Sequence, residues 1–123
     1  MKIQKQKIVL IEDDAALGNS ILELLHLNNF EVTWFDDSTQ ALVYLTQNIP
    51  DLIISDLMMP KMNGGELFFQ IRKNKKFTTV PYIIITANVD DETKLRQLEL
   101  GVNDYIMKPF KVKELIFKVN NVL

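Results

Sequence analysis

The sequence predicts an α/β fold in which five parallel strands, in the order 2-1-3-4-5, are covered by helices on both faces. Short apolar runs alternate with segments of helical periodicity, and this pair repeats five times along the chain. Such alternation implies right-handed βαβ crossovers and a parallel sheet between two helical layers. No linker, repeat or low-complexity segment interrupts the 123 residues. We therefore expect one domain over residues 1–123, with a structured core of about 7–123.

The composition limits the class of protein. A hydrophobic content of 47% in a chain of this length is enough for a single core. The net charge of −2 does not favour nucleic-acid binding, and the lack of cysteine excludes disulfides and thiolate sites. No apolar run is long enough for a signal peptide or a membrane span. We expect a soluble cytoplasmic protein.

The strands are predicted from apolar runs. Residues 8–11, 52–54 and 82–86 form nearly continuous runs, which are typical of strands covered on both faces. Residues 30–35 alternate more, which indicates a strand at the edge of the sheet. Residues 104–107 are expected to form a short fifth strand.

The helices are predicted from apolar spacing and capping residues. Asp14 and Asp37 are suited to cap the first two helices, the second over residues 38–47. The third is expected over residues 66–75, after a loop at Gly64 and Gly65.

The last two helices have clear apolar positions. The acidic residues 90–92 begin the fourth helix, with Leu95 and Leu98 on its inner side, and Gly101 ends it. The apolar stripe of the fifth helix comprises Val112, Leu115, Ile116, Val119 and Leu123.

Acidic residues follow two strands that are predicted to be neighbours. Glu12 and Asp13 follow the first strand, and Asp56 follows the third. In the 2-1-3-4-5 order these strands flank the switch point, where ligands bind outside the carboxyl ends. Three close carboxylates cannot all stay ionised without a compensating charge. A set of oxygen ligands without His or Cys suits Mg²⁺, or Mn²⁺.

The expected metal ligands come from both strand ends. Asp13 and Asp56 are candidates for direct ligands, and Glu12 for a ligand through water. The backbone carbonyl of Met58 could also reach the ion, because the loop after Asp56 is expected to curl over the site.

Two further polar residues end the remaining strands. Thr86 ends the fourth strand and Lys108 follows the fifth, so the same rim gains a hydroxyl and a cation. Each has a structural alternative, because Lys108 would also neutralise buried acids and Thr86 would also cap the next helix. Together with the carboxylate of Asp56 and a metal, they indicate a phosphoryl-transfer site.

Four segments form a recognisable combination: Val9-Leu10-Ile11-Glu12-Asp13-Asp14; Asp56-Leu57-Met58-Met59-Pro60 with Met62-Asn63-Gly64; Ile85-Thr86-Ala87; and Asp104-Tyr105-Ile106-Met107-Lys108-Pro109-Phe110. With these segments the chain resembles the receiver domain of two-component response regulators along essentially its whole length. The resemblance implies a flavodoxin-like (βα)₅ fold.

The resemblance also implies roles for the residues at the rim. Asp56 matches the phosphoacceptor, which takes a phosphoryl group from a phosphohistidine on a sensor histidine kinase or phosphotransfer protein. Glu12 and Asp13 match the metal-binding pair, Thr86 the switch hydroxyl and Lys108 the lysine that contacts the phosphoryl group. Such a domain catalyses its own phosphorylation and slow dephosphorylation and is not an enzyme with a separate substrate.

Further expectations follow from the resemblance. Tyr105 matches the aromatic switch, which turns inward when the Thr86 hydroxyl moves towards phosphate. The fourth helix, fifth strand and fifth helix would form the surface that contacts a downstream effector domain or protein, and a phosphorylation-dependent homodimer is possible. The Lys108–Pro109 bond is expected to be cis. Met58 and Asn88 match positions that vary in the family and tune phosphate lifetime.

Other readings of the sequence remain open. A degenerate receiver would act only as a protein–protein interaction module. A haloacid-dehalogenase-type phosphatase requires a second Asp at the position of Met58. A flavin- or nucleotide-binding module requires a first loop rich in Gly or in Ser and Thr, in place of the acidic residues 12–14. We expect neither direct nucleic-acid binding nor membrane binding, and both a stand-alone receiver and part of a longer regulator fit the chain.

Overall fold

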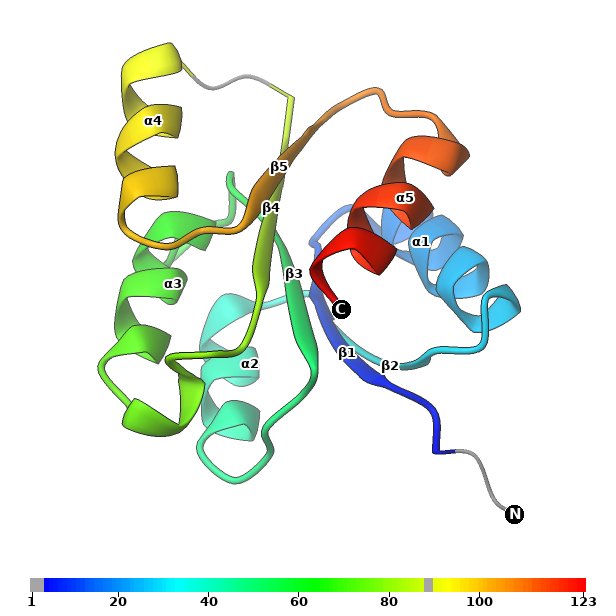
Figure 1. The fold of residues 1–123 in the computed structure, drawn as a ribbon, viewed down its shortest axis with the longest axis horizontal. Coiled ribbons are helices and arrows are strands. Elements are labelled where there is room, and N and C mark those ends of the chain that lie inside the picture. The colour runs from blue at the N-terminus through cyan, green and yellow to red at the C-terminus, as the bar shows by residue number, and fades with distance from the viewer. Residues whose placement is uncertain (1–3, 88–89) are drawn as a thin grey trace.

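A computed structural model describes residues 4–87 and 90–123, which form a five-stranded parallel sheet between two helical layers (Figure 1). The strands are β1 (Lys7–Ile11), β2 (Glu31–Phe35), β3 (Leu52–Asp56), β4 (Tyr82–Thr86) and β5 (Asp104–Met107). Their order is β2-β1-β3-β4-β5 and all four pairings are parallel, which confirms the predicted fold class.

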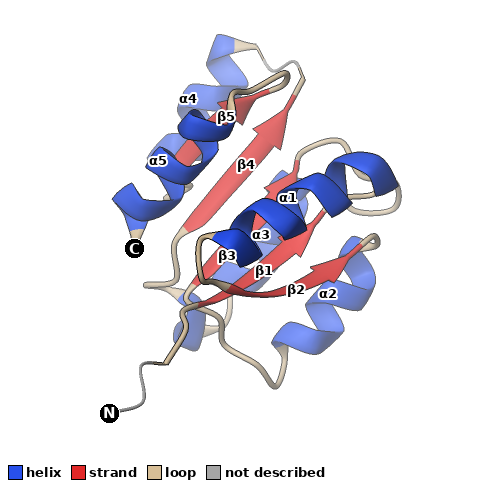
Figure 2. Cartoon of the chain, turned by 90° about the vertical axis from the view of Figure 1, so that its right-hand side faces the viewer, coloured by secondary structure: helices blue, strands red, loops and turns tan. Residues whose placement is uncertain are grey.

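The helices lie on both faces of the sheet, as Figure 2 shows from the side. They are α1 (Ala15–Leu27), α2 (Ser38–Leu45), α3 (Gly64–Arg72), α4 (Asp91–Glu99) and α5 (Val112–Val122), with a short 3₁₀ turn, η1 (Lys75–Phe77). Helices α1 and α5 cover one face, and α2, α3 and α4 cover the other. None of the helices that the structure describes has the length and apolar character needed to cross a membrane.

Each central strand contributes to two hydrophobic cores, one on each face. On β1, Val9 and Ile11 pack in the core beneath α2 and α3, whereas Ile8 and Leu10 pack in the core beneath α1 and α5. Because both faces are covered, the sequence of such a strand is continuously apolar. Strand β2 lies at the sheet edge and is only partly buried, which accounts for its alternating sequence.

The strand register brings the carboxyl ends of the sheet level with one another. Ile11 at the end of β1 pairs with Ser55 on β3, and the next residue, Asp56, pairs with Ile85 on β4. Backbone pairing continues past β1, because the amide of Glu12 donates to the carbonyl oxygen of Phe35 at 3.0 Å. Residues that follow different strands therefore meet at one edge.

Helix α3 begins at Gly64, two residues earlier than predicted. The prediction of a loop at Gly64 and Gly65 is therefore wrong. Asn63 caps the helix: its side chain accepts from the amide of Glu66 at 2.9 Å, and the carboxylate of Glu66 accepts from the amide of Asn63 at 3.2 Å. This reciprocal capping offsets the weak helix propensity of the two glycines. The helix also ends earlier, at Arg72, and η1 follows it.

The inward positions of α4 and α5 were predicted only in part. Leu98 is partly buried, and Leu115 and Val119 are fully buried, but Leu95 and Val112 are each 58% exposed. On α4 the prediction rested on Leu95 and Leu98, which are three residues apart. Two apolar residues at this spacing define only a narrow apolar stripe, which does not determine how the helix is rotated towards the sheet.

Gly64 lies against the backbone of the strand that carries Asp56. A Cβ atom at Gly64 would lie 2.5 Å from the carbonyl oxygen of Asp56, whereas one at Gly65 would meet Nε2 of Gln97, the flexible end of a side chain, at 2.4 Å. Backbone must therefore shift to admit a side chain at Gly64 but not at Gly65.

We expect Gly64→Ala to lower the free energy of unfolding by about 1–3 kcal/mol, because overpacking against backbone forces the helix away from the strand. Gly65→Ala, in the same turn, is the matched control and should change stability by less than about 0.5 kcal/mol. Urea unfolding measures both values. Equal stability of the two variants would contradict the close approach at Gly64.

Candidate functional site

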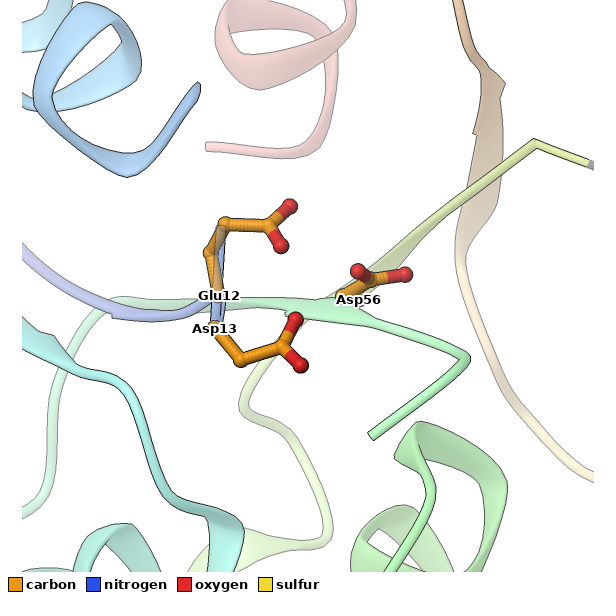
Figure 3. A group of neighbouring side chains, drawn as sticks. All are labelled: Glu12, Asp13 and Asp56. Carbon is orange, nitrogen blue, oxygen red and sulfur yellow. The ribbon is translucent and has the colours of Figure 1, made fainter. Parts of the chain in front are cut away.

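Three carboxylates converge at the carboxyl edge of the sheet. Glu12 and Asp13 follow β1, and Asp56 is the last residue of β3. A carboxylate oxygen from each lies within 4.8 Å of the others, and Figure 3 shows the side chains turned towards one another. Glu12 and Asp56 are buried, at 1% and 5% exposed, whereas Asp13 is exposed to solvent. The structure thus brings together the acidic residues that the sequence singled out.

Lys108 supplies a positive charge to this cluster. Its Nζ lies 3.0 Å from Oδ2 of Asp56 and 3.1 Å from Oε1 of Glu12. The residue follows β5, and its amide donates to the carbonyl oxygen of Thr86 at 2.8 Å, which holds it beside the end of β4. The Lys108–Pro109 peptide bond is cis, as predicted.

Backbone amides hold the two buried carboxylates in place. The amide of Met58 donates to Oδ1 of Asp56, and the amide of Asp14 donates to Oε2 of Glu12, both at 3.2 Å. The other oxygen of Glu12, Oε1, is buried and makes no hydrogen bond within the described residues, so only the ion pair with Lys108 compensates it. The side chain of Met58 is 69% exposed.

Thr86 and Tyr105 lie on adjacent strands beside the cluster. Thr86 ends β4 and is fully buried. Tyr105 on β5 is 2% exposed, and burial raises the pKa of its hydroxyl to about 12. That hydroxyl has no hydrogen-bond partner in the part of the chain that the structure describes, and Nζ of Lys94 lies 5.8 Å from the centre of the ring. Asn88 lies outside the described residues.

The electrostatics of the site show an excess of negative charge. Burial and the adjacent carboxyl group of Asp56 raise the pKa of Glu12 from 4.5 to about 7, against the opposing effects of the Asp14 amide and Lys108. Burial alone would lower the pKa of Lys108, but its hydrogen bond to Asp56 and its ion pair with Glu12 outweigh this and raise it. One lysine therefore does not neutralise the cluster.

The donor set fits a hard divalent cation. All the ligand atoms that it offers are oxygens, and the excess negative charge favours binding of a cation. The acidic residues Glu12, Asp13 and Asp56 could hold such an ion.

One contact at the site was not predicted from the sequence. The indole Nε1 of Trp34 donates to the carbonyl oxygen of Glu12 at 2.9 Å. Alternation along β2 placed Trp34 on one face of the strand, but this pattern contains no information about the loop after the neighbouring strand.

Comparison with known families decides the identity of the domain. The model of the response regulator receiver domain matches residues 8–120. The chain belongs to the response regulator receiver family. The chain is also similar to several curated proteins. The DNA-binding response regulator MtrA of Mycobacterium tuberculosis is 38% identical over 97% of this chain and 51% of its own length.

Two further relatives are a transcriptional regulator and a hybrid histidine kinase. The transcriptional regulatory protein BaeR of Escherichia coli is 33% identical over 95% of this chain and 48% of its own length. Hybrid signal transduction histidine kinase D of Dictyostelium discoideum is 36% identical over 97% of this chain but only 8% of its own length. The chain spans about half the length of the regulators and a small part of the kinase.

Solved receiver structures have the same fold. The chemotaxis response regulator CheY4 of Vibrio cholerae superposes with a TM-score of 0.91 at 25% identity, covering 98% of this chain and 100% of the other. The non-phosphorylated HemR receiver domain of Leptospira biflexa gives 0.87 at 34% identity, covering 96% and 94%.

The raised pKa of Glu12 predicts how stability depends on pH. Between pH 4.5 and about 7 the folded receiver keeps a proton on Glu12 that the unfolded chain loses. In this window without metal, Glu12 therefore lowers the free energy of unfolding as the pH rises. We expect Glu12→Gln to gain stability relative to the wild type over the same window, by an amount on the order of 2 kcal/mol.

Urea unfolding from pH 4.5 to 8 in the presence of a chelator measures this difference. Glu23→Gln, which removes an exposed carboxyl from α1, controls for the loss of one acidic residue. A stability difference between Glu12→Gln and the wild type that is constant with pH would contradict the electrostatic account of the site.

Proposed function

We propose that Asp56 accepts a phosphoryl group from a phosphohistidine on a sensor histidine kinase or phosphotransfer protein, and that this switches the surface formed by α4, β5 and α5. One observation carries the proposal: Nζ of Lys108 lies 3.0 Å from Oδ2 of Asp56, within a cluster of three carboxylates. A carboxylate nucleophile, a fixed cation and a cation-binding set are the parts that phosphoryl transfer requires. Membership of the receiver family supports the same assignment.

In the proposed transfer, a carboxylate oxygen of Asp56 attacks the phosphorus atom. An O–P bond forms and the P–N bond to imidazole breaks, after which the imidazole takes a proton from solvent. The Lys108 ammonium lies 3.0 Å from Oδ2 of Asp56 and would offset negative charge that develops beside this carboxylate during the attack. Dephosphorylation reverses the modification when water attacks phosphorus, which releases inorganic phosphate and regenerates the carboxylate. The chain would thus catalyse changes only in its own covalent state.

The proposed ligands of Mg²⁺ or Mn²⁺ are Asp13 and Asp56 directly, the backbone carbonyl of Met58, and Glu12 through water. A divalent ion held by them would balance negative charge on the transferring group. Lys108 would exchange its present ion pairs for contacts with phosphoryl oxygens. The buried Oε1 of Glu12, for which Lys108 is the one partner among the described residues, supports this arrangement because it leaves unbalanced charge for the ion to neutralise.

A groove beside the site is suited to the phosphodonor protein. It has a volume of about 850 Å³ and lies between α1 and the segment after β5. Apolar residues such as Leu17, Leu24 and Phe110 line it, and Lys108 lines it as well. A partner that binds this groove would hold its phosphohistidine next to Lys108, and therefore within reach of Asp56.

The proposed switch connects the site with the surface formed by α4, β5 and α5. Phosphorylation adds about −1.5 to −2 charges and strong acceptor oxygens, towards which the Thr86 hydroxyl would move. The ring of Tyr105 is already buried, so phosphorylation is proposed to stabilise this inward position and not to create it. The responding surface carries exposed apolar side chains on each element: Leu95, Met107 and Phe117. A downstream effector, or a second receiver in a homodimer, would bind there.

Phosphorylation can be measured directly with a small-molecule phosphodonor such as acetyl phosphate. With Mg²⁺ the intact mass of the wild type should increase by one phosphoryl group, and omission of Mg²⁺ should abolish the increase. Asp56→Asn removes the nucleophile and should give no mass change. We expect Lys108→Ala to lower the rate by at least about tenfold, because one fixed cation is lost from the transition state.

Asp51→Asn is the matched control for this experiment. Asp51 lies just before β3, at the opposite end from Asp56, and its carboxylate accepts from the amide of Lys7 at 2.7 Å. This variant should be phosphorylated like the wild type. If the folded wild type stays unmodified with Mg²⁺ present, the chain acts as an interaction module and not as a phosphoacceptor.

A further inference from the structure

The side chain of Trp34 links the edge strand β2 to the acidic end of β1. Its Nε1 donates to the carbonyl oxygen of Glu12 at 2.9 Å, and the amide of Glu12 donates to the carbonyl oxygen of Phe35 at 3.0 Å. Strand β2 therefore holds both backbone polar groups of Glu12. One is held by the main chain and the other by a side chain.

Gly18 on α1 leaves the space that this indole occupies. A Cβ atom at Gly18 would lie 2.1 Å from Cζ2 and 2.4 Å from Cε2 of Trp34, distances that real Cβ atoms do not reach. Gly18 is also a buried residue within the helix, where glycine is less favourable than alanine. Glycine, the weaker helix former, thus occupies a position where any larger residue would displace the indole.

The hydrogen bond from Trp34 also determines the position of Asp13. The carbonyl of Glu12 and the amide of Asp13 belong to one planar peptide unit. A hydrogen bond that holds this carbonyl therefore also holds the backbone amide of Asp13. The carboxylate of Asp13 is exposed and makes no hydrogen bond or ion pair with any residue that the structure describes. Its place within 4.8 Å of the other two carboxylates therefore depends on the orientation of its backbone.

We propose that Trp34 is a positioning residue for the cation site, whose indole N–H holds the Glu12–Asp13 peptide so that both carboxylates face Asp56 before the ion binds. The inference rests on the proposed function, because it concerns the ion assigned there. The indole does not contact the ion. It improves affinity because ligands that are already oriented lose less freedom on binding.

The first test is the affinity of the whole chain for Mg²⁺, measured by isothermal titration calorimetry. Trp34→Phe keeps an aromatic ring on β2 but removes the donor, and we expect the Kd for Mg²⁺ to rise about three- to tenfold. Val32→Ala is the matched control, because Val32 lies on the same strand and packs against the same core as Trp34. It should lower stability with a Kd within about twofold of the wild type.

A second variant tests the space that Gly18 leaves for the indole, without changing Trp34. Gly18→Ala should raise the Kd for Mg²⁺ by a similar factor, even though alanine is the better helix former. When added to Trp34→Phe it should have little further effect, because the two changes remove the same contact. A Kd unchanged in both single variants would overturn the inference and leave the indole a packing residue.

The indole N–H can also be followed in the wild type. The chain contains one tryptophan, so its ¹H–¹⁵N spectrum has one indole cross-peak. This peak should move during a Mg²⁺ titration with the Kd found by calorimetry, and a peak that does not move would contradict the coupling.

If the wild type does not bind Mg²⁺ at all, the proposed metal assignment fails together with the inference. Wild-type binding with unaltered Kd values in the variants overturns the inference alone.

Discussion

The ion pairs of Lys108 with Glu12 and Asp56 are the interactions on which the acidic edge of this receiver depends. Three carboxylates lie within 4.8 Å, and one ammonium group at 3.0 and 3.1 Å compensates them only in part. Burial, together with the adjacent carboxyl group of Asp56, raises the pKa of Glu12 to about 7 despite this ammonium group. Parallel pairing fixes the strands that carry these residues, so they cannot separate to relieve the repulsion. The fold thereby maintains a site that a cation stabilises.

The fold and the placement of the site residues follow from a few features of the sequence. Continuous apolar runs identify buried parallel strands, and strict alternation with helices leaves few possible topologies. Once the strand order is known, Glu12, Asp56 and Lys108 are expected at the same edge, because the carboxyl ends of parallel strands share one edge. Separation along the chain is irrelevant to that argument, which explains why residues so far apart can be grouped from the sequence alone.

Contacts that depend on how helices lie on the sheet could not be predicted in the same way. The start of α3 was misjudged because glycine suggests a loop, and the capping by Asn63 outweighs this preference. Leu95 is exposed because a sparse apolar pattern does not define the orientation of a helix. The contact of Trp34 with Gly18 requires both the crossing position of α1 and the register of β2. Neither quantity is encoded in local periodicity.

In the proposed mechanism, Asp56 and a divalent cation act at one site. Fluoroberyllate, which mimics a phosphoryl group on an aspartate, tests it most directly when ¹⁹F NMR spectra are recorded with and without Mg²⁺. We predict bound fluorine signals with Mg²⁺ and none without it. Bound signals that persist without the ion, or no binding when the ion is present, would contradict the account.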